Sequence, residues 1–157
     1  MPLYFAYGSN MDRQAMRLRC PGSRPLGLAR LARHKFFIMG SGYASVKCDA
    51  RADVHGVLYD LALSDVSALD RYEDIGRGLY RKVAQPVLRA VGAPMRALVY
   101  IGGSDVEGTP AAAYLNAILA AARDWSLPAA YVSYLASFGA SATAPEAPRR
   151  AIQGKGV

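Results

Sequence analysis

Two short segments of the sequence carry residues that could bind an anion and move a proton. The first is the run Tyr4-Phe5-Ala6-Tyr7-Gly8-Ser9-Asn10, in which an extended aromatic stretch leads into a glycine and two helix-capping residue types. Glycine lets a ligand approach the backbone, and N–H groups at the start of a helix carry partial positive charge. The pattern predicts a carboxylate or phosphate site at this turn, with Ser9 or Asn10 capping a helix that begins near Met11. A strand, a turn and a capped helix without any ligand is the alternative.

The second segment contains Glu73, one of only three glutamates in the chain. Ser64 stands where an N-cap belongs, and the spacing predicts a short helix over residues 65–73. Glu73 falls on the same apolar face of this helix as Leu69, so its carboxylate is expected to point inward. Burial raises the pKa of a carboxyl group and suits it to exchange protons near neutral pH. The alternative is a helix-end glutamate that only caps the helix or pairs with Arg71, Arg77 or Arg81.

The rest of the pattern places helices near the two ends of the chain and strands between them. A first strand is expected over residues 2–7, and a hairpin is expected around Gly92-Ala93-Pro94. Further extended segments are predicted over residues 26–39, 43–48 and 54–63, and helices over residues 110–125 and 128–138. Gly56 indicates a bulge or a close backbone approach. This order favours an α+β or mixed α/β domain over regular β-α-β alternation.

Length and composition bound the organisation of the chain. With 157 residues and 52% hydrophobic composition, residues 1–138 suffice for one domain with its own core. Residues 139–157, rich in Ala, Pro, Ser and Gly, are predicted to form a flexible tail. The two cysteines have no metal-ligand spacing and suit free thiols in a reduced setting. No segment resembles a signal peptide or a membrane span, so a cytoplasmic protein is expected.

The net charge of +7 is concentrated in the first third of the chain. Residues 1–51 contain nine basic side chains and two acidic ones, whereas residues 52–157 contain ten of each. Such a surface could attract nucleic acid. However, the basic residues form no single run and few aromatic residues alternate with them, so a solvated basic face is the favoured interpretation.

Several short motifs, in order along nearly the whole chain, together resemble the γ-glutamylcyclotransferase family, which includes the AIG2-like proteins. The initial run through Asn10 and Met11 is similar to its signature, and Leu69-Asp70-Arg71-Tyr72-Glu73 is similar to the segment that carries its catalytic glutamate. The remaining matches are His55-Gly56-Val57-Leu58-Tyr59, Tyr80, Ala97-Leu98-Val99-Tyr100, Thr109-Pro110 with Tyr114, and Leu127-Pro128-Ala129-Ala130-Tyr131. This chain departs from the family pattern at Asp74, where a glycine is usual.

The resemblance implies a partly closed mixed β-barrel flanked by helices, with the active site at one end. It implies that the α-amine of a γ-glutamyl substrate attacks its own δ-carbonyl and releases 5-oxoproline and an amine. Glu73 would be the general base and then the general acid. The resemblance assigns substrate binding to Tyr4, Phe5, Ala6, Tyr7, Gly8, Ser9, Asn10, Tyr80 and Tyr114. If Asp74 pointed inward, its charge would raise the pKa of Glu73 further.

The expected partner is a small γ-glutamyl substrate, and a homodimer is left open. No metal, cofactor, nucleic acid or membrane is expected, and His34 and His55 are interpreted as structural because neither has a partner at ligand spacing. One alternative is a related cyclotransferase that acts on γ-glutamyl amines or isopeptides. Another is a noncatalytic ligand-binding or regulatory module that kept the fold.

Overall fold

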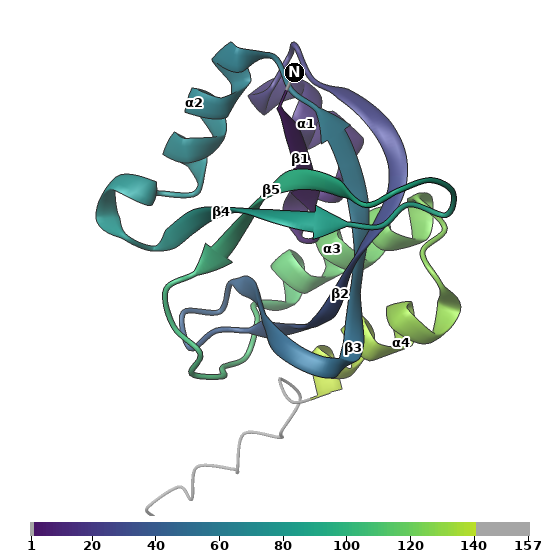
Figure 1. The fold of residues 1–157 in the computed structure, drawn as a ribbon. Coiled ribbons are helices and arrows are strands. Elements are labelled where there is room, and N and C mark those ends of the chain that lie inside the picture. Colours follow the sequence, from purple (N-terminus) through teal and green to yellow (C-terminus); the bar gives the residue numbers. More distant parts are fainter. Residues whose placement is uncertain (1, 141–157) are drawn as a thin grey trace, which may run out of the picture.

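The computed structural model describes residues 2–140, which form a curved five-stranded mixed sheet with four helices (Figure 1). The prediction of an α+β fold is confirmed. The strands are β1 (Leu3–Ala6), β2 (Arg24–Ile38), β3 (Ala44–Asp60), β4 (Tyr80–Val87) and β5 (Met95–Gly102). The helices are α1 (Arg13–Arg19), α2 (Leu63–Tyr72), α3 (Ala112–Asp124) and α4 (Ala129–Ala140), with single 3₁₀ turns at Ser9–Met11 and Ile75–Arg77. Most of the predicted tail, residues 141–157, lies outside the described residues.

The strand order β2-β3-β1-β5-β4 places the short strand β1 at the centre of the sheet. It runs antiparallel to β3 and parallel to β5, and the other neighbouring pairs are antiparallel. Because a central strand is covered on both faces, Tyr4, Phe5 and Ala6 are all buried. The turn that follows β1 therefore starts from a buried strand with a neighbouring strand on each side.

The sheet does not close into a barrel. Its two edges come together at one isolated antiparallel bridge between Arg30 of β2 and Leu88, which follows β4. Each of these residues donates its backbone N–H to the carbonyl of the other at 2.9 Å. Helices α3 and α4 pack side by side, and α2 stands apart from them near the β4–β5 hairpin (Figure 1).

Residues 44–60 form one continuous strand, so the prediction of two separate strands over 43–48 and 54–63 was wrong. The polar segment between them lies within β3 because pairing with β2 resumes on both sides of it. Ala32 lies opposite Asp53 and His34 lies opposite Cys48, so residues 49–52 form a bulge without partners in the ladder. A register shift opposite this segment accompanies Arg33, whose φ of 58° marks a bulge. A bulge leaves its extra residues unpaired, so polar residues can interrupt the ladder here without ending the strand.

The helix starts also differ from the predictions. Asp12, not Ser9 or Asn10, caps α1, and its Oδ1 accepts from the Ala15 N–H at 2.7 Å. Helix α2 begins at Leu63 without a side-chain cap, so the assignment of Ser64 as N-cap was wrong. With Asp12 in the capping role, the Asn10 side chain is available for other contacts.

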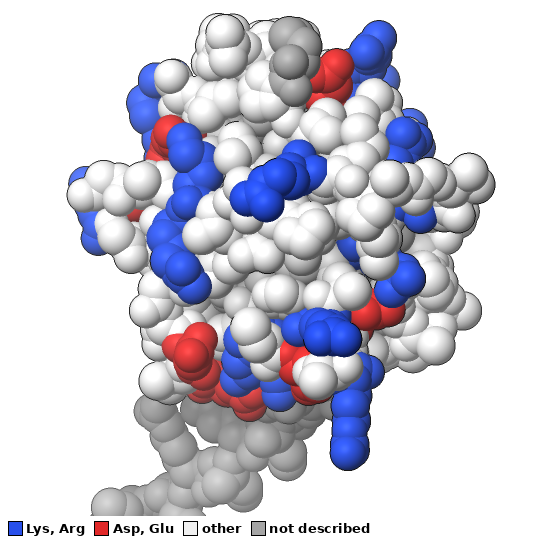
Figure 2. Space-filling model, in the orientation of Figure 1, with Lys and Arg blue, Asp and Glu red and all other residues white. Residues whose placement is uncertain are grey.

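In the folded protein, basic residues from the first third of the chain pair with acidic residues from later segments. Five of the nine basic residues in the first third, Arg13, Arg24, Arg30, Lys35 and Lys47, pair with carboxylates. All their partners come from residues 53–124. The face drawn in Figure 2 accordingly carries basic side chains in several separate groups, with acidic side chains beside some of them. No helix within residues 2–140 is long and apolar enough to cross a membrane.

Gly56 provides the first test of this architecture. A Cβ at this position would lie 2.3 Å from the Ala6 carbonyl oxygen and 2.9 Å from the Phe5 ring, which realises the predicted close approach. Gly56→Ala should therefore lower the free energy of unfolding by about 1–3 kcal/mol, the usual cost of overpacking, as measured by urea denaturation. Gly76→Ala is the matched control, because a Cβ there meets nothing within 4 Å. Equal stability of the two variants would contradict the close packing of β1 on β3.

Candidate active site

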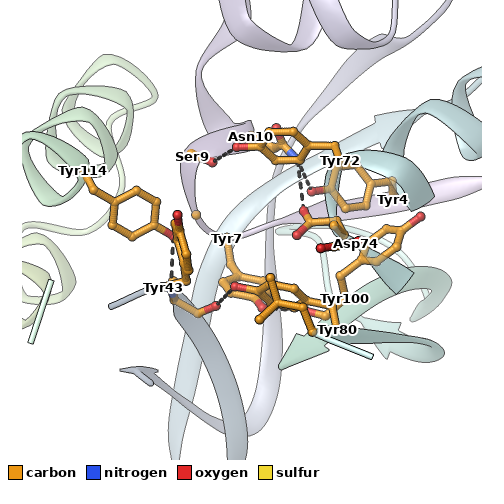
Figure 3. Close-up of a pocket in the computed structure, with 14 residues that line it drawn as sticks. Tyr4, Tyr7, Ser9, Asn10, Tyr43, Tyr72, Asp74, Tyr80, Tyr100 and Tyr114 are labelled. Atoms are coloured by element: carbon orange, nitrogen blue, oxygen red, sulfur yellow. Dashed lines mark hydrogen bonds between the residues drawn. The ribbon is translucent and has the colours of Figure 1, made fainter. Parts of the chain in front are cut away.

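The turn after β1, the end of α2 and the middle of the sheet enclose a cavity of about 210 Å³ (Figure 3). Seven of the chain's ten tyrosines line it, so its wall consists largely of aromatic rings and hydroxyl groups. The lining residues are Tyr4, Tyr7, Gly8, Ser9, Asn10, Tyr43, Ala44, Tyr72, Glu73, Asp74, Leu79, Tyr80, Tyr100 and Tyr114. These residues come from separate segments between Tyr4 and Tyr114, and most of those predicted to bind substrate are among them.

Glu73 ends helix α2 as its C-cap and faces this cavity. Its Oε1 accepts from the Asn10 Nδ2 at 3.3 Å. Burial raises the pKa of Glu73 to about 7, and the positive charge of Arg19 opposes that rise. Arg77 pairs with Asp74 at 3.8 Å rather than with Glu73. The glutamate thus lies in the cavity as a carboxyl group that can gain or lose a proton near neutral pH.

Asn10 connects Glu73 to a residue that the sequence analysis missed, Arg19. Asn10 is buried, its Nδ2 also donates to the Tyr4 hydroxyl at 3.0 Å, and its Oδ1 accepts from the Arg19 guanidinium. This last bond fixes the amide so that its NH₂ group faces Glu73. The guanidinium also lies over the Tyr72 ring, 3.7 Å from its centre. Arg19 therefore positions a hydrogen-bond donor on Glu73 without touching the carboxylate.

The predicted anion-binding turn borders the same cavity. Among the described residues, no backbone hydrogen bond uses the N–H groups of Gly8, Ser9 or Asn10, whereas the next two N–H groups close the 3₁₀ turn. Gly8 has a φ of −120°, so a left-handed conformation is not the reason for glycine here. A Cβ at Gly8 would instead point into the cavity, 3.8 Å from the Tyr114 hydroxyl. The absence of a side chain keeps space open beside three available donors.

Tyr80 and Tyr114 hold the opposite wall by binding one residue from two sides. The Tyr80 hydroxyl donates to the Ala44 carbonyl at 2.6 Å, and the Ala44 N–H donates to the Tyr114 hydroxyl at 3.1 Å. Burial raises the pKa of both phenols, that of Tyr114 to about 12, so both remain neutral. The Tyr80 hydroxyl already donates its hydrogen to the Ala44 carbonyl. The Tyr114 hydroxyl only accepts a hydrogen bond from the Ala44 N–H, so its own hydrogen remains available for a ligand.

Not every predicted binding residue reaches the cavity. Phe5 and Ala6 are fully buried in β1 and do not line it. Because they belong to the buried strand that leads into the turn, Phe5 and Ala6 position the turn and do not contact the cavity.

Asp74 lines the cavity at its edge but does not explain the pKa of Glu73, which is raised by burial. The expectation that Asp74 would add to this shift therefore has no support from the structure. Its carboxylate is turned toward Arg77, because Asp74 has a left-handed backbone with φ 54° and ψ 45°.

Five further lining residues were not predicted. They are Tyr43, Ala44, Tyr72, Leu79 and Tyr100. Tyr72 and Tyr100 belong to recognised motifs, and the aromatic type within those motifs was the available signal. Tyr43 and Leu79 lie in connecting segments whose path depends on the long β2–β3 ribbon and the β4–β5 hairpin.

The histidines and cysteines occupy other parts of the molecule. His34 Nδ1 lies 2.9 Å from the Ala32 carbonyl oxygen, and the His55 ring packs on Tyr131. Cys20 is buried, Cys48 is exposed, and no disulfide joins them. Within residues 2–140, no cluster of His, Cys, Asp or Glu has the arrangement of a metal site.

Comparisons with known proteins agree on one family. A profile described as the AIG2-like family matches residues 53–135. The chain is 27% identical over 139 residues to the γ-glutamylcyclotransferase of Homo sapiens, across 82% of this chain and 74% of that protein.

Solved structures show the same relationship. A structure titled γ-glutamyl cyclotransferase superposes with a TM-score of 0.79 at 26% identity, over 85% of each chain. YkqA from Bacillus subtilis superposes with a TM-score of 0.77 at 24% identity, over 89% of this chain and 54% of that one, and shares the fold.

Arg19→Met should raise the pKa of Glu73 above its value of about 7, because the variant removes the positive charge that favours the carboxylate. Carbon-13 NMR of protein labelled at the glutamate side chains measures this directly, since only three glutamates contribute signals. Arg17→Met is the matched control from the same helix, with an exposed side chain. An unchanged Glu73 titration in Arg19→Met would contradict the coupling.

The raised pKa of Glu73 also predicts how stability depends on pH. Between its ordinary pKa of 4.5 and about 7, the folded protein holds a proton that the unfolded chain has lost, so stability falls as pH rises through this window. Glu73→Gln cannot lose this proton. From pH 5 to pH 8 the variant should gain about 2–3 kcal/mol in unfolding free energy relative to the parent, measured by urea denaturation at both pH values. Parallel pH profiles for the two proteins would rule out a buried, neutral Glu73 at pH 5.

Proposed function

The chain belongs to the AIG2-like family, and on this basis we propose that it is a γ-glutamylcyclotransferase. Such an enzyme converts a γ-glutamyl amide into 5-oxoproline and a free amine. The observation that carries the proposal is Glu73, a carboxyl group with a pKa of about 7 inside a tyrosine-lined cavity. The adjoining turn offers backbone N–H donors to the α-carboxylate of a glutamyl group, and Glu73 offers a proton acceptor to its reacting amine.

Glu73 has the properties needed for the proton transfers. The substrate's α-ammonium must lose a proton before its nitrogen can attack the δ-carbonyl, and Glu73 in its carboxylate form accepts that proton. The new carbon–nitrogen bond closes the five-membered ring. When the original amide bond breaks, Glu73 returns a proton to the departing nitrogen. The ring nitrogen passes its remaining surplus proton to the released amine, which leaves as an ammonium ion. A pKa near neutral pH serves both steps, because neither the uptake nor the release of the proton is strongly uphill.

The turn after β1 supplies the binding site for the substrate's α-carboxylate. Gly8, Ser9 and Asn10 line the cavity with backbone N–H groups that make no backbone hydrogen bond within residues 2–140, and the Tyr114 hydroxyl has a proton to donate beside Gly8. Neutral donors bind an anion while leaving the pKa of the nearby Glu73 high, which a lysine or arginine in the same place would lower.

The tyrosine side chains that line the cavity restrict the conformation of the substrate's γ-glutamyl group. Nucleophile and electrophile belong to one molecule, so the rate depends on folding the γ-glutamyl group into the attacking conformation. Tyr7 and Tyr80 are held rigidly, because their hydroxyl groups donate to the backbone carbonyls of Tyr100 and Ala44. A fixed wall of this kind excludes conformations in which the α-amine points away from the δ-carbonyl.

Glu73→Gln should bind substrate but lose turnover, with kcat reduced by about 10²–10⁴-fold, the usual contribution of a positioned acid–base group. In the parent protein kcat/KM should rise with pH through about 7, because the carboxylate form of Glu73 is the active base. Release of 5-oxoproline from a panel of γ-glutamyl amides, followed by mass spectrometry, measures both effects. Glu107→Gln is the matched control, because Glu107 is exposed and pairs with Lys47.

A noncatalytic module makes a different prediction for the same panel. It would bind γ-glutamyl compounds without releasing 5-oxoproline, in the parent and in both variants. Full turnover by Glu73→Gln would instead show that cyclisation occurs but that another group moves the proton.

A further inference from the structure

The tyrosine hydroxyl groups in the cavity differ in how their hydrogens are used. Those of Tyr7, Tyr80 and Tyr100 donate to acceptors of the protein itself. A hydroxyl group has one hydrogen, so these three have none left for a substrate. The hydroxyls of Tyr4 and Tyr114 instead accept a hydrogen bond from an N–H donor. Neither of them donates to an acceptor within residues 2–140, so each keeps a hydrogen for a ligand.

The two remaining hydrogens belong to different parts of the cavity. The Tyr114 hydroxyl lies beside Gly8, at the turn that offers donors to the α-carboxylate. The Tyr4 hydroxyl lies beside Glu73, because one amide group binds both. The Asn10 Nδ2 donates to the Tyr4 hydroxyl at 3.0 Å and to the Glu73 Oε1 at 3.3 Å (Figure 3). The acid–base group and an unused hydrogen-bond donor are therefore neighbours.

The cyclisation requires a donor close to Glu73. As the α-amine attacks, the lone pair of its nitrogen forms the bond to the δ-carbon, and the π electrons of the carbonyl group move to the oxygen. The nitrogen that delivers its proton to Glu73 is bonded to this carbon in the intermediate, so the negative oxygen forms near Glu73. A fixed donor that faces the oxygen stabilises this charge and lowers the barrier. Among the described residues that line the cavity, none is a lysine or arginine, so a neutral donor must serve.

Tyr4 has the rigidity that such a donor needs. Its side chain is buried, and its ring packs against those of Tyr59 and Tyr100, with centres 6.3 Å and 5.8 Å away. The bond from Asn10 occupies a lone pair of the hydroxyl oxygen and so directs the hydrogen elsewhere. Burial raises the pKa of the Tyr4 phenol well above its ordinary value of 10.0, so the phenol keeps its proton. A donor that neither moves nor ionises needs no reorganisation during the reaction.

We propose that Tyr4 is a second catalytic residue, whose hydroxyl group donates a hydrogen bond to the substrate's δ-carbonyl oxygen and stabilises the oxyanion that forms there. The inference rests on the proposed cyclotransferase activity and goes beyond it by assigning a donor to the carbonyl oxygen. Tyr4 keeps its proton throughout. When the carbonyl double bond forms again, the bond to the departing nitrogen breaks and Glu73 protonates that nitrogen. Tyr4 thus acts on the oxygen, whereas Glu73 acts on the nitrogens.

Tyr4→Phe removes the hydroxyl group and keeps the buried ring. With the γ-glutamyl amide that the parent converts fastest, kcat should fall by about 10²–10³-fold, the usual cost of losing one oxyanion donor. KM should change little, because the neutral carbonyl group of the bound substrate needs this bond less than the oxyanion does. The rise of kcat/KM with pH should remain centred near pH 7, because Glu73 is still the base.

Tyr59→Phe is the matched control. Tyr59 is equally buried and packs on the Tyr4 ring, but it does not line the cavity. Its loss of one hydroxyl group should leave kcat close to the parent value. A similar loss of kcat in both variants would assign the effect to packing and overturn the catalytic role of Tyr4.

Replacement of Tyr4 by 3-fluorotyrosine tests the donor while the hydroxyl group stays in place. Fluorine makes the phenol more acidic and therefore a stronger donor, so kcat should rise above the parent value. An unchanged or lower kcat would contradict the assignment.

The remaining outcomes separate this inference from the proposed function. A Tyr4→Phe variant with the parent kcat overturns the catalytic role and leaves the cyclotransferase activity standing. A pH profile displaced from that of the parent also overturns it, because Tyr4 would then act by holding Asn10 against Glu73. If the parent releases no 5-oxoproline from any γ-glutamyl amide of the panel, the proposed function fails and this inference fails with it.

Discussion

The removal of the Glu73 carboxyl group from water is the constraint on which the site depends. An exposed glutamate is ionised at neutral pH and is a poor proton donor, whereas burial raises the pKa of Glu73 to about 7. Burial of this kind costs stability when the group ionises, so the surrounding fold must tolerate the cost. The end of α2 is suitable, because Leu69 one turn earlier is fully buried and anchors the helix against the sheet.

The tyrosines solve a second problem that burial creates. A wall made only of aliphatic side chains would exclude water but would offer nothing to a polar substrate. Tyrosine combines a large apolar ring with a neutral hydroxyl group. The hydroxyl of Tyr100 donates to Asp70 at 2.6 Å, and that of Tyr80 donates to Ala44, so these rings are fixed by bonds directed away from the substrate. The tyrosine hydroxyl groups thus make the cavity polar and rigid without adding charge themselves.

The sequence predicted the parts of the fold and site that depend on local patterns. The strand–glycine turn at residues 4–10 and the inward direction of Glu73 follow from residue type and helical spacing. The continuity of β3 was missed, because the polar segment 49–53 looks like a connection, whereas residues 49–52 form a bulge and pairing with β2 resumes on both sides of it. Tyr43 was missed for the same reason, since its place in the cavity depends on where that ribbon turns.

Arg19 illustrates a further limit of sequence reading and a principle of the site. Its spacing suggested only a basic residue near the end of a short helix, and nothing local points to a residue in α2. The structure places it beyond Asn10, which transmits its influence to Glu73 through an amide. A direct ion pair would lower the pKa of the carboxyl group by about 1–3 units and leave a base too weak to accept a proton at neutral pH. An amide between the two charges keeps the carboxylate hydrogen-bonded and its pKa high. The intervening position of Asn10 is therefore as important to the site as the charge of Arg19.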